Sequence, residues 1–346
     1  MVAKSPAKAK IGVLGASGYT GSELVRLLLR HPNVEIALLT ADRRAGQEMR
    51  AVFPQFSPFE LPTLVSIESV DWKKAALDLA FCALPHATTQ KVISDLLAKA
   101  PDTKVVDLSA DFRLHDAAAY AKWYGHEHHA PKLQGEAVYG LVEVHRDKIK
   151  KARLVANPGC YPTASLLALL PLQRANLLAV PSDVVIDAKS GISGAGKKPS
   201  DRTHFSENHG SVSAYGVFGH RHEPEIEQEL GAAVTFVPHL VPLDRGILET
   251  IYARVRPGTT VRDVTDAMDA AYKNAPFIRL TGEALPEIKH AAYTNFCDIG
   301  WRVDATGGRV LLVSVIDNLV KGAAGQAIQN MNVMLGYDER MGLLPV

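Results

Sequence analysis

One cysteine stands in a setting that suits covalent chemistry. Cys160 lies in the segment NPGCYPT, residues 157–163, between a short apolar run and an apolar helical segment. Pro162 suits the first turn of a helix, so we expect Cys160 just before or at a helix N-terminus. That position lowers the pKa of a thiol and raises its thiolate fraction. The flanking Gly and Pro indicate a rigid, open turn that a substrate can approach, and a buried structural cysteine is the alternative.

A thiolate that attacks acyl groups needs an acid/base partner. His220 and His222 lie in the segment GHRHEPE, residues 219–225, and in a strand they would point to the same side. Either of them can be the partner. No third ligand follows at the spacing of a zinc site, so we do not expect a metal. A second group of histidines is expected on a solvated loop: His126, His128 and His129.

A glycine-rich turn, GASGYTG at residues 15–21, follows the first apolar run. Glycines let the backbone approach phosphates, and a helix N-terminus attracts a pyrophosphate. The spacing is GxxGxxG rather than GxGxxG, and a turn without a ligand is the alternative. The next strand ends in Asp42, Arg43 and Arg44. An acidic residue there favours NAD, but two adjacent guanidiniums favour the 2′-phosphate of NADP.

Two further segments are candidates for holding an anion. The segment KSGISGAGK, residues 189–197, combines lysines with a Gly/Ser backbone. Arg113 ends the segment DLSADFR, residues 107–113, and offers a guanidinium. A mobile loop or a structural ion pair is the alternative for each.

The order of apolar and periodic runs predicts the elements that carry these residues. A strand at 10–14, a helix at 22–30 and a strand at 34–39 form a βαβ unit, which predicts a parallel sheet. The same alternation continues with strands at 77–83, 104–108 and 154–157 and helices at 88–99 and 164–170, whereas 111–140 is expected to be loops. After Pro158 the chain becomes rich in strands (184–188, 233–238, 249–255 and 310–316), with helices at 260–274 and 322–335, which predicts an α+β domain.

Composition narrows the class of protein. The chain has 346 residues and a formal net charge of +1, which is enough for about two domains and lacks the basic excess of a nucleic-acid binder. No apolar run reaches the roughly 18 residues of a membrane span. Three separated cysteines, Cys82, Cys160 and Cys297, indicate a reducing compartment. We therefore expect a cytoplasmic protein without nucleic-acid or membrane partners, in which Cys82 and Cys297 are buried.

Seven segments, spread along most of the chain, have sequences like those of the motifs of one known family. They are GASGYTG at 15–21, LPH at 84–86, DLSADFR at 107–113, NPGCYPT at 157–163, KSGISGAG at 189–196, HRHEPEI at 220–226 and DNLVKGAAGQAIQNMN at 317–332. Together they resemble the N-acetyl-γ-glutamyl-phosphate reductases of arginine biosynthesis.

The resemblance implies an α/β protein of the type shared with aspartate-semialdehyde dehydrogenase and glyceraldehyde-3-phosphate dehydrogenase. It implies a Rossmann-like NADP-binding domain over residues 1–158 and 318–346, to which the final helix returns. An α+β catalytic and dimerisation domain over residues 159–317 would carry the oligomer interface. A homodimer or homotetramer is therefore expected.

The resemblance also assigns roles to residues. Cys160 matches the nucleophile, the acid/base histidine falls on His220 or His222, and Asn318 matches an asparagine near the nicotinamide. The residues expected to bind the cofactor are Gly15, Ser17, Gly18, Tyr19, Thr20, Gly21, Arg43, Arg44, Pro85, Ser190, Gly191 and Asn318. Those expected to bind the substrate are Arg113, Asn157, Lys189, Ser193 and Gly194.

The implied reaction is the NADPH-dependent reduction of N-acetyl-γ-glutamyl phosphate, a small acyl phosphate. Attack by Cys160 would release phosphate and leave a thioester, and hydride would convert this to N-acetylglutamate 5-semialdehyde. One alternative is a related reductase acting on aspartyl phosphate or carrier-linked aminoadipyl phosphate. The others are a nucleotide-binding sensor without catalysis and a thiol hydrolase, which needs no dinucleotide site.

Overall fold

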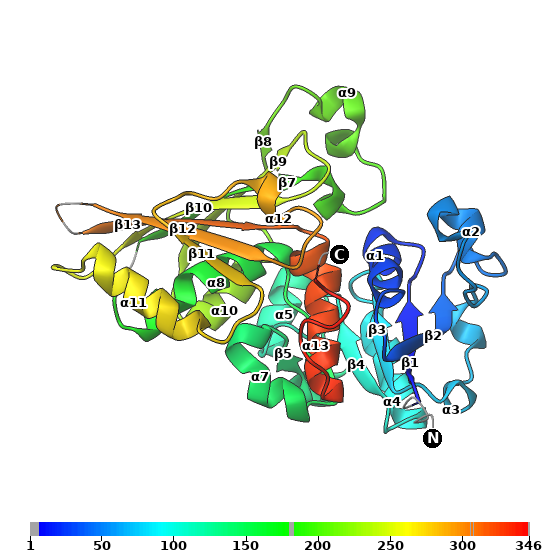
Figure 1. The fold of residues 1–346 in the computed structure, drawn as a ribbon. Helices are drawn as coiled ribbons and strands as arrows, with labels where there is room; N and C mark the ends of the chain where they lie inside the picture. The colour runs from blue at the N-terminus through cyan, green and yellow to red at the C-terminus, as the bar shows by residue number, and fades with distance from the viewer. Residues whose placement is uncertain (1–6, 180–182, 305, 307, 345–346) are drawn as a thin grey trace, which may run out of the picture. The chain divides into compact units, whose positions relative to one another are not determined.

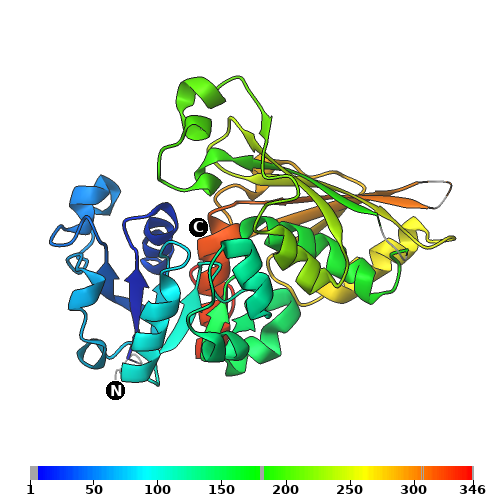
Figure 2. The same ribbon diagram turned by 180° about the vertical axis from the view of Figure 1, so that it is seen from behind.

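The protein is described from a computed structural model, which covers residues 7–179, 183–304, 306 and 308–344. The chain divides into two compact units, residues 1–158 with 324–346 and residues 159–323. The sequence places the return to the first domain at 318, whereas residues 318–323 group with the second unit. Figures 1 and 2 show the elements of both units from two sides.

The first unit contains a six-stranded sheet in the order β2-β1-β3-β4-β6-β5. Its pairings are parallel throughout the described strands, which confirms the predicted sheet. The strand β3 and residues 11–14 of β1 are buried, and their continuous apolar sequences are those of parallel strands covered on both faces. The strands are β1 (Ala9–Leu14), β2 (Val34–Thr40), β3 (Leu79–Cys82), β4 (Lys104–Asp107), β5 (Val138–Tyr139) and β6 (Leu154–Ala156).

Helices and short turns connect these strands. The longer helices are α1 (Tyr19–Leu28), α4 (Thr89–Lys99), α7 (Val142–Lys151) and α13 (Gly325–Leu335). The shorter ones are α2 (Met49–Val52), η1 (Pro54–Phe56), η2 (Ile67–Ser69), α3 (Trp72–Ala75), α5 (Ala117–Tyr124) and α6 (Pro131–Glu136). The helix α1 begins three residues before the predicted start, so Tyr19, Thr20 and Gly21 form its first turn.

The expectation of loops over residues 111–140 is wrong, because α5, α6 and β5 lie there. Local capping explains both helices. The side chain of Asp116 accepts from the amides of Ala118 and Ala119 at the start of α5, and Pro131 is the first residue of α6. Their few turns give too little periodicity to stand out in the sequence.

The second unit contains a mixed seven-stranded sheet in the order β11-β12-β13-β10-β7-β9-β8. Burial alternates along β7, β9 and β10, so one face of the sheet packs on helices, chiefly α8 (Figure 1). The strands are β7 (Val184–Gly191), β8 (Ser213–Ala214), β9 (Val234–Val241), β10 (Ile247–Arg254), β11 (Ile278–Gly282), β12 (Cys297–Val303) and β13 (Arg309–Ile316).

The helices of this unit are α8 (Cys160–Arg174), α9 (Phe205–Asn208), α10 (Glu223–Leu230), α11 (Val261–Tyr272) and α12 (Ile288–Ala291), with the 3-10 turns η3 (Ile192–Ala195) and η4 (Asp201–Thr203). The four predicted strands and the helix near 260–274 are confirmed, but β11, β12 and α10 were not foreseen. The predicted helix 322–335 begins only at Gly325, because Val320–Ala324 forms a π-helical turn. Cys82 and Cys297 are buried, as expected.

Candidate active site

Steric crowding explains two glycines of the turn at residues 15–21. Gly15 has a φ of +87°, and a Cβ added to it would lie 2.4 Å from the carbonyl oxygen of Ala83. A Cβ on Gly21 would lie 2.2 Å from the carbonyl oxygen of Gly15. The amides of Gly15 and Ala16 both donate to the carbonyl oxygen of Thr40, at 3.2 and 2.8 Å. The turn is therefore compact and tied to the end of β2.

The cofactor residues expected in the first unit lie at the carboxyl ends of adjacent strands. The helix α1 begins after Gly18, which has no side chain to accept from the first-turn amides. Arg43 and Arg44 are exposed just beyond β2, and Pro85 follows β3, the other neighbour of β1. This edge of a doubly wound sheet, with a helix N-terminus free of a side-chain cap, suits a pyrophosphate and a ribose phosphate.

The turn that contains Pro85 is held by a buried carboxylate. Asp111 accepts from the amides of Ala87 and Thr89 at 2.8 and 3.2 Å, and Ala87 has a strained φ of +68°. The ring of His128 bonds the carbonyl oxygen of Asp111 at 2.7 Å and is buried. The expectation that His128 lies on a solvated loop is therefore wrong.

Arg113 and Asn157 come together in the first unit. The guanidinium of Arg113 donates from Nε to the carbonyl oxygen of Asn157 at 2.8 Å and from Nη2 to that of Leu108 at 3.0 Å. The side-chain oxygen of Asn157 accepts from Asn330 at 3.0 Å. Both residues are buried. These bonds join the turns that follow β4 and β6.

Cys160 is the first residue of α8, as the sequence predicted, and is partly buried. The amide of Gly159 before it donates to Oε1 of Glu225 at 2.8 Å. The amide and hydroxyl of Thr163 both bond the carbonyl oxygen of Gly159, at 3.0 and 2.8 Å. A Cβ on Gly322 would lie 2.7 Å from Cβ of Cys160. Cys160 is thus placed by one local turn and two distant segments.

The two histidines do not lie in a strand, so the same-side geometry considered for a strand does not apply to them. His220 is the first residue of a turn in which the amide of Glu223 donates to its carbonyl oxygen at 3.0 Å, and His222 is the residue before α10. Their ring centroids are still 4.9 Å apart. Nδ1 of His220 accepts from the amide of His222 at 3.1 Å, so the neutral ring of His220 carries its proton on Nε2.

Aromatic rings surround His220. The centroids of Tyr161, Tyr215 and Phe236 lie 5.7, 5.4 and 5.3 Å from its own. Burial lowers the pKa of His220 to about 4, with a smaller contribution from the charge of Arg221. The ring is therefore neutral near pH 7 and suits donation of a hydrogen bond from Nε2.

Sequence reasoning missed Tyr161, Tyr215 and Glu225. The hydroxyls of Tyr161 and Tyr215 lie 3.2 Å apart, and burial raises the pKa of Tyr215 to about 12, so this side chain stays a phenol. Tyr161 and Glu225 fall inside motifs that the sequence singled out. Tyr215 lies in a segment without a helical or strand-like pattern of apolar residues, and no local motif indicates that it belongs to the site.

Four expected residues of the second unit gather around one turn. Asn318 accepts from the amide of Gly246 at 2.7 Å and donates to Oγ of Ser193 at 2.9 Å. A Cβ on Gly194 would lie 3.0 Å from Oγ of Ser190 and 3.4 Å from Nδ2 of Asn318. This cluster joins residues far apart in the sequence.

The start of the segment 189–197 is not a loop, because residues 189–191 belong to β7. A Cβ on Gly191 would lie 2.7 Å from the carbonyl oxygen of Asp244. The ammonium of Lys189 pairs with Asp187 at 2.5 Å. Its charge is thus compensated within the protein.

A buried carboxyl group lies under the first turn of α8. Oγ of Ser165 is 3.0 Å from the carbonyl oxygen of Tyr161 and 2.6 Å from Oε2 of Glu249. One hydroxyl proton cannot serve both acceptors. Both bonds form when Glu249 is protonated and donates to Ser165, which donates to Tyr161. Burial raises the pKa of Glu249 well above its usual range, consistent with this arrangement.

Glu249→Gln keeps these bonds without an ionisable group. Because the folded pKa is raised, the unfolded chain loses its proton first, and Glu249 lowers the free energy of unfolding as pH rises above the usual carboxyl pKa. The slope is at most about 1.4 kcal/mol per pH unit. Urea unfolding from pH 5 to pH 8 should therefore show that the free energy of unfolding of Glu249→Gln, relative to that of wild type, increases with pH. Parallel profiles would contradict a protonated Glu249.

Comparisons with known proteins first define a class. The family model described as "Semialdehyde dehydrogenase, NAD binding domain" matches residues 10–152, and "Semialdehyde dehydrogenase, dimerisation domain" matches residues 160–318. The crystal structure of aspartate semialdehyde dehydrogenase II from Vibrio cholerae, complexed with ASA, has a TM-score of 0.73 at 18% identity, covering 95% of this chain and 98% of that one. The protein therefore has the fold of the semialdehyde dehydrogenases.

Closer relatives define the family. N-acetyl-gamma-glutamyl-phosphate reductase of Afipia carboxidovorans is 60% identical over 97% of both chains. The probable chloroplastic N-acetyl-gamma-glutamyl-phosphate reductase of Arabidopsis thaliana is 49% identical over 97% of this chain and 84% of its own. The chain belongs to the N-acetyl-γ-glutamyl-phosphate reductase family. No helix in the described ranges combines the length and apolar character that a membrane crossing requires.

Proposed function

We propose that this chain reduces N-acetyl-γ-glutamyl phosphate to N-acetylglutamate 5-semialdehyde and phosphate, with NADPH as the reductant. One observation carries the proposal. Cys160 is the first residue of α8, and the neutral ring of His220 packs on Tyr161, the residue that follows Cys160. Family membership supports the substrate, because relatives that cover almost the whole chain bear the reductase name.

The chemistry follows from the thiol. The thiolate of Cys160 attacks the γ-carbonyl carbon, the bond from that carbon to the phosphate oxygen breaks, and a thioester remains on Sγ. The thioester carbon on Sγ then accepts a hydride, which bound NADPH would supply. The resulting alkoxide collapses to the aldehyde as the carbon–sulfur bond breaks and the thiolate returns. Nε2–H of His220 stabilises the alkoxide by donating a hydrogen bond.

The first unit offers groups that fit the cofactor. The first-turn amides of α1 would hold the pyrophosphate, and the missing side chains at Gly15 and Gly21 let the backbone approach it. The exposed guanidiniums of Arg43 and Arg44 would hold the 2′-phosphate. The three cysteines are not joined by disulfides in the described structure, which favours a reducing compartment, and we place the reaction in the cytoplasm.

The reverse reaction tests the proposal. Purified protein is given N-acetylglutamate 5-semialdehyde with phosphate and NADP⁺, and aspartate semialdehyde and NAD⁺ are the comparison substrates. We expect strong turnover only with the acetylated aldehyde and a preference for NADP⁺. A preference for aspartate semialdehyde would favour the related reductase. Tight NADPH binding without any turnover would favour a nucleotide-binding sensor.

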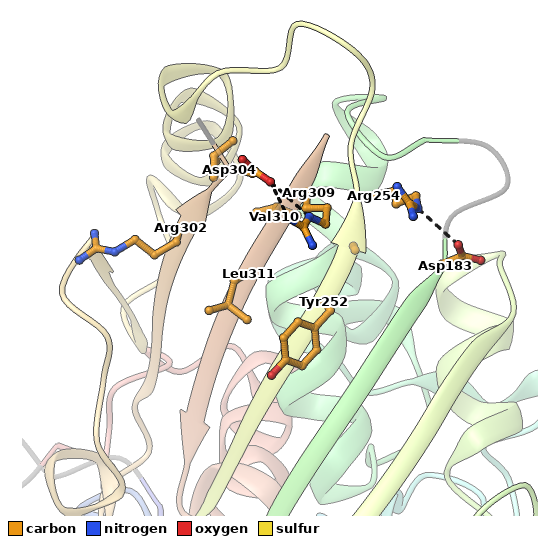
Figure 3. Close-up of a pocket in the computed structure, with 10 residues that line it drawn as sticks. Asp183, Tyr252, Arg254, Arg302, Asp304, Arg309, Val310 and Leu311 are labelled. Atoms are coloured by element: carbon orange, nitrogen blue, oxygen red, sulfur yellow. Dashed lines mark hydrogen bonds and ion pairs between the residues drawn. The ribbon is translucent and has the colours of Figure 1, made fainter. Parts of the chain in front are cut away.

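We also propose that the chain forms a homodimer through the exposed face of its seven-stranded sheet. Strand register aligns Tyr252, Leu311 and Arg302 across β10, β13 and β12, and these side chains line a cavity of about 400 Å³ (Figure 3). Tyr252 is 49% exposed. An exposed aromatic beside an apolar side chain and an arginine is typical of an interface, and the family model names this domain for dimerisation.

The double substitution Tyr252→Glu and Leu311→Glu should therefore lower the molar mass measured by light scattering after gel filtration. Desolvating two carboxylates in the interface opposes association. Arg262→Gln is the control, because Arg262 is exposed on α11. A dimeric double variant would disprove this interface, and a wild-type mass of four chains would show that a second interface also exists.

A further inference from the structure

An arginine that the sequence did not single out lies beside the thiol site. Arg202 belongs to η4, in the excursion that also carries α9 and β8 and connects β7 to β9 (Figure 1). Its guanidinium carbon lies 5.6 Å from the ring centroid of Tyr215. Tyr215 contacts His220 and hydrogen-bonds with Tyr161, the residue after Cys160. The guanidinium is therefore one side chain away from residues that surround the thiol.

Hydrogen bonds fix the backbone at Arg202. The amide of Ser200 donates to Oγ1 of Thr203 at 3.0 Å, and their two hydroxyls are also 3.0 Å apart. The buried side chain of Asn208 donates to the carbonyl oxygen of Arg202 at 3.3 Å. The turn that carries Arg202 is thus held in place by hydrogen bonds.

The charge of Arg202 has no partner among the carboxylates of the described residues. Asp201 and Glu207 line a cavity of about 210 Å³ together with Arg202, but no ion pair joins either of them to its guanidinium within the described chain. Lys189, in contrast, is held by Asp187 at 2.5 Å. The positive charge of Arg202 lowers the pKa of Tyr215 against the larger effect of burial. An exposed arginine stacked on a site tyrosine is therefore available to an anion.

We propose that Arg202 binds the α-carboxylate of the substrate and so selects acyl derivatives that carry this carboxylate. The inference rests on the proposed function. The substrate has two anionic groups, and its phosphate is bonded to the carbon that Cys160 attacks. The carboxylate lies at the opposite end of the acyl chain and stays with it until the aldehyde leaves. A guanidinium one side chain away from the residues that surround the thiol matches the carboxylate, which it can bind in a bidentate manner.

Steady-state kinetics of Arg202→Gln in the reverse direction separate the two anions. We expect the KM for N-acetylglutamate 5-semialdehyde to rise at least tenfold, because a charge-assisted contact is lost, while the KM for phosphate stays unchanged. The aldehyde 4-acetamidobutanal lacks the carboxylate and should react with equal kcat/KM in both proteins. Arg202→Lys should recover part of the loss, and Arg262→Gln is the control for removal of an exposed arginine.

Calorimetric binding of N-acetylglutamate, compared with N-acetyl-4-aminobutyrate, gives a readout that does not depend on turnover. Wild type should prefer the former, and Arg202→Gln should lose that preference. A raised KM for phosphate alone would assign Arg202 to the phosphate and overturn the inference, as would unchanged discrimination in both measurements. Carboxylate-dependent binding in a wild-type protein that turns over no aldehyde would overturn the proposed function but leave the role of Arg202 in place.

Discussion

Cys160→Ser should reduce turnover of N-acetyl-γ-glutamyl phosphate by a factor on the order of 10⁴ or more. A serine hydroxyl at the start of α8 is not ionised near neutral pH, and the proposed mechanism needs a thiolate to form the acyl intermediate. The rate is measured as NADPH oxidation under saturating substrate. Mass spectrometry of the wild-type protein after rapid acid quenching should show the acyl group on the peptide that contains Cys160.

Two controls make this result specific. Cys297→Ala should stay active, because Cys297 is buried beside Ser314 on β13 and takes no part in the proposed chemistry. NADPH should bind Cys160→Ser with the wild-type Kd, because the glycine turn and the arginines expected to hold it are unchanged. Retained turnover in Cys160→Ser would exclude the thioester route, and loss of NADPH binding would indicate that the variant is misfolded.

Gly322→Ala should lower kcat by about 10²-fold, because small displacements of a reacting group carry costs of that size. The added methyl would lie 2.7 Å from Cβ of Cys160 and 3.2 Å from its Cα. Neither segment yields easily, because Cys160 begins a buried helix and the amide of Gly322 bonds the carbonyl oxygen of Asp317 at 2.9 Å. The free energy of unfolding should also fall by about 1–3 kcal/mol.

The rate at which iodoacetamide modifies the protein reports the setting of Cys160 without substrate, and it should change in Gly322→Ala. Gly135→Ala is the matched control. Gly135 lies in α6, and an added Cβ there meets nothing within 4 Å. Wild-type turnover and wild-type alkylation in Gly322→Ala would show that the π-helical turn Val320–Ala324 does not place the nucleophile.

Local patterns were sufficient for several elements that carry the candidate site. The apolar runs at 10–14, 34–39 and 104–108 become β1, β2 and β4, since buried parallel strands are continuous in apolar residues. Pro162 signalled the helix whose first residue is Cys160, because proline suits an initial turn. The same kind of reasoning failed at 111–140, where helices of a few turns depend on single capping residues. It also gave no guide at His220 and His222, whose i and i+2 spacing occurs in a turn and not in a strand.

The sequence by itself determined the parallel βαβ start with its glycine turn, the position of Cys160 at the beginning of a helix and the α+β character of the second half. Each of these depends on residues within a few positions of one another. Only the tertiary structure decided that Glu225 bonds the amide of Gly159, that Gly322 abuts Cys160 and that Arg202 lies over Tyr215. These contacts join segments that are distant in the chain. They exist only because strand pairing and helix packing bring those segments together. The periodicity and spacing of residues in the sequence reveal neither the pairing nor the packing.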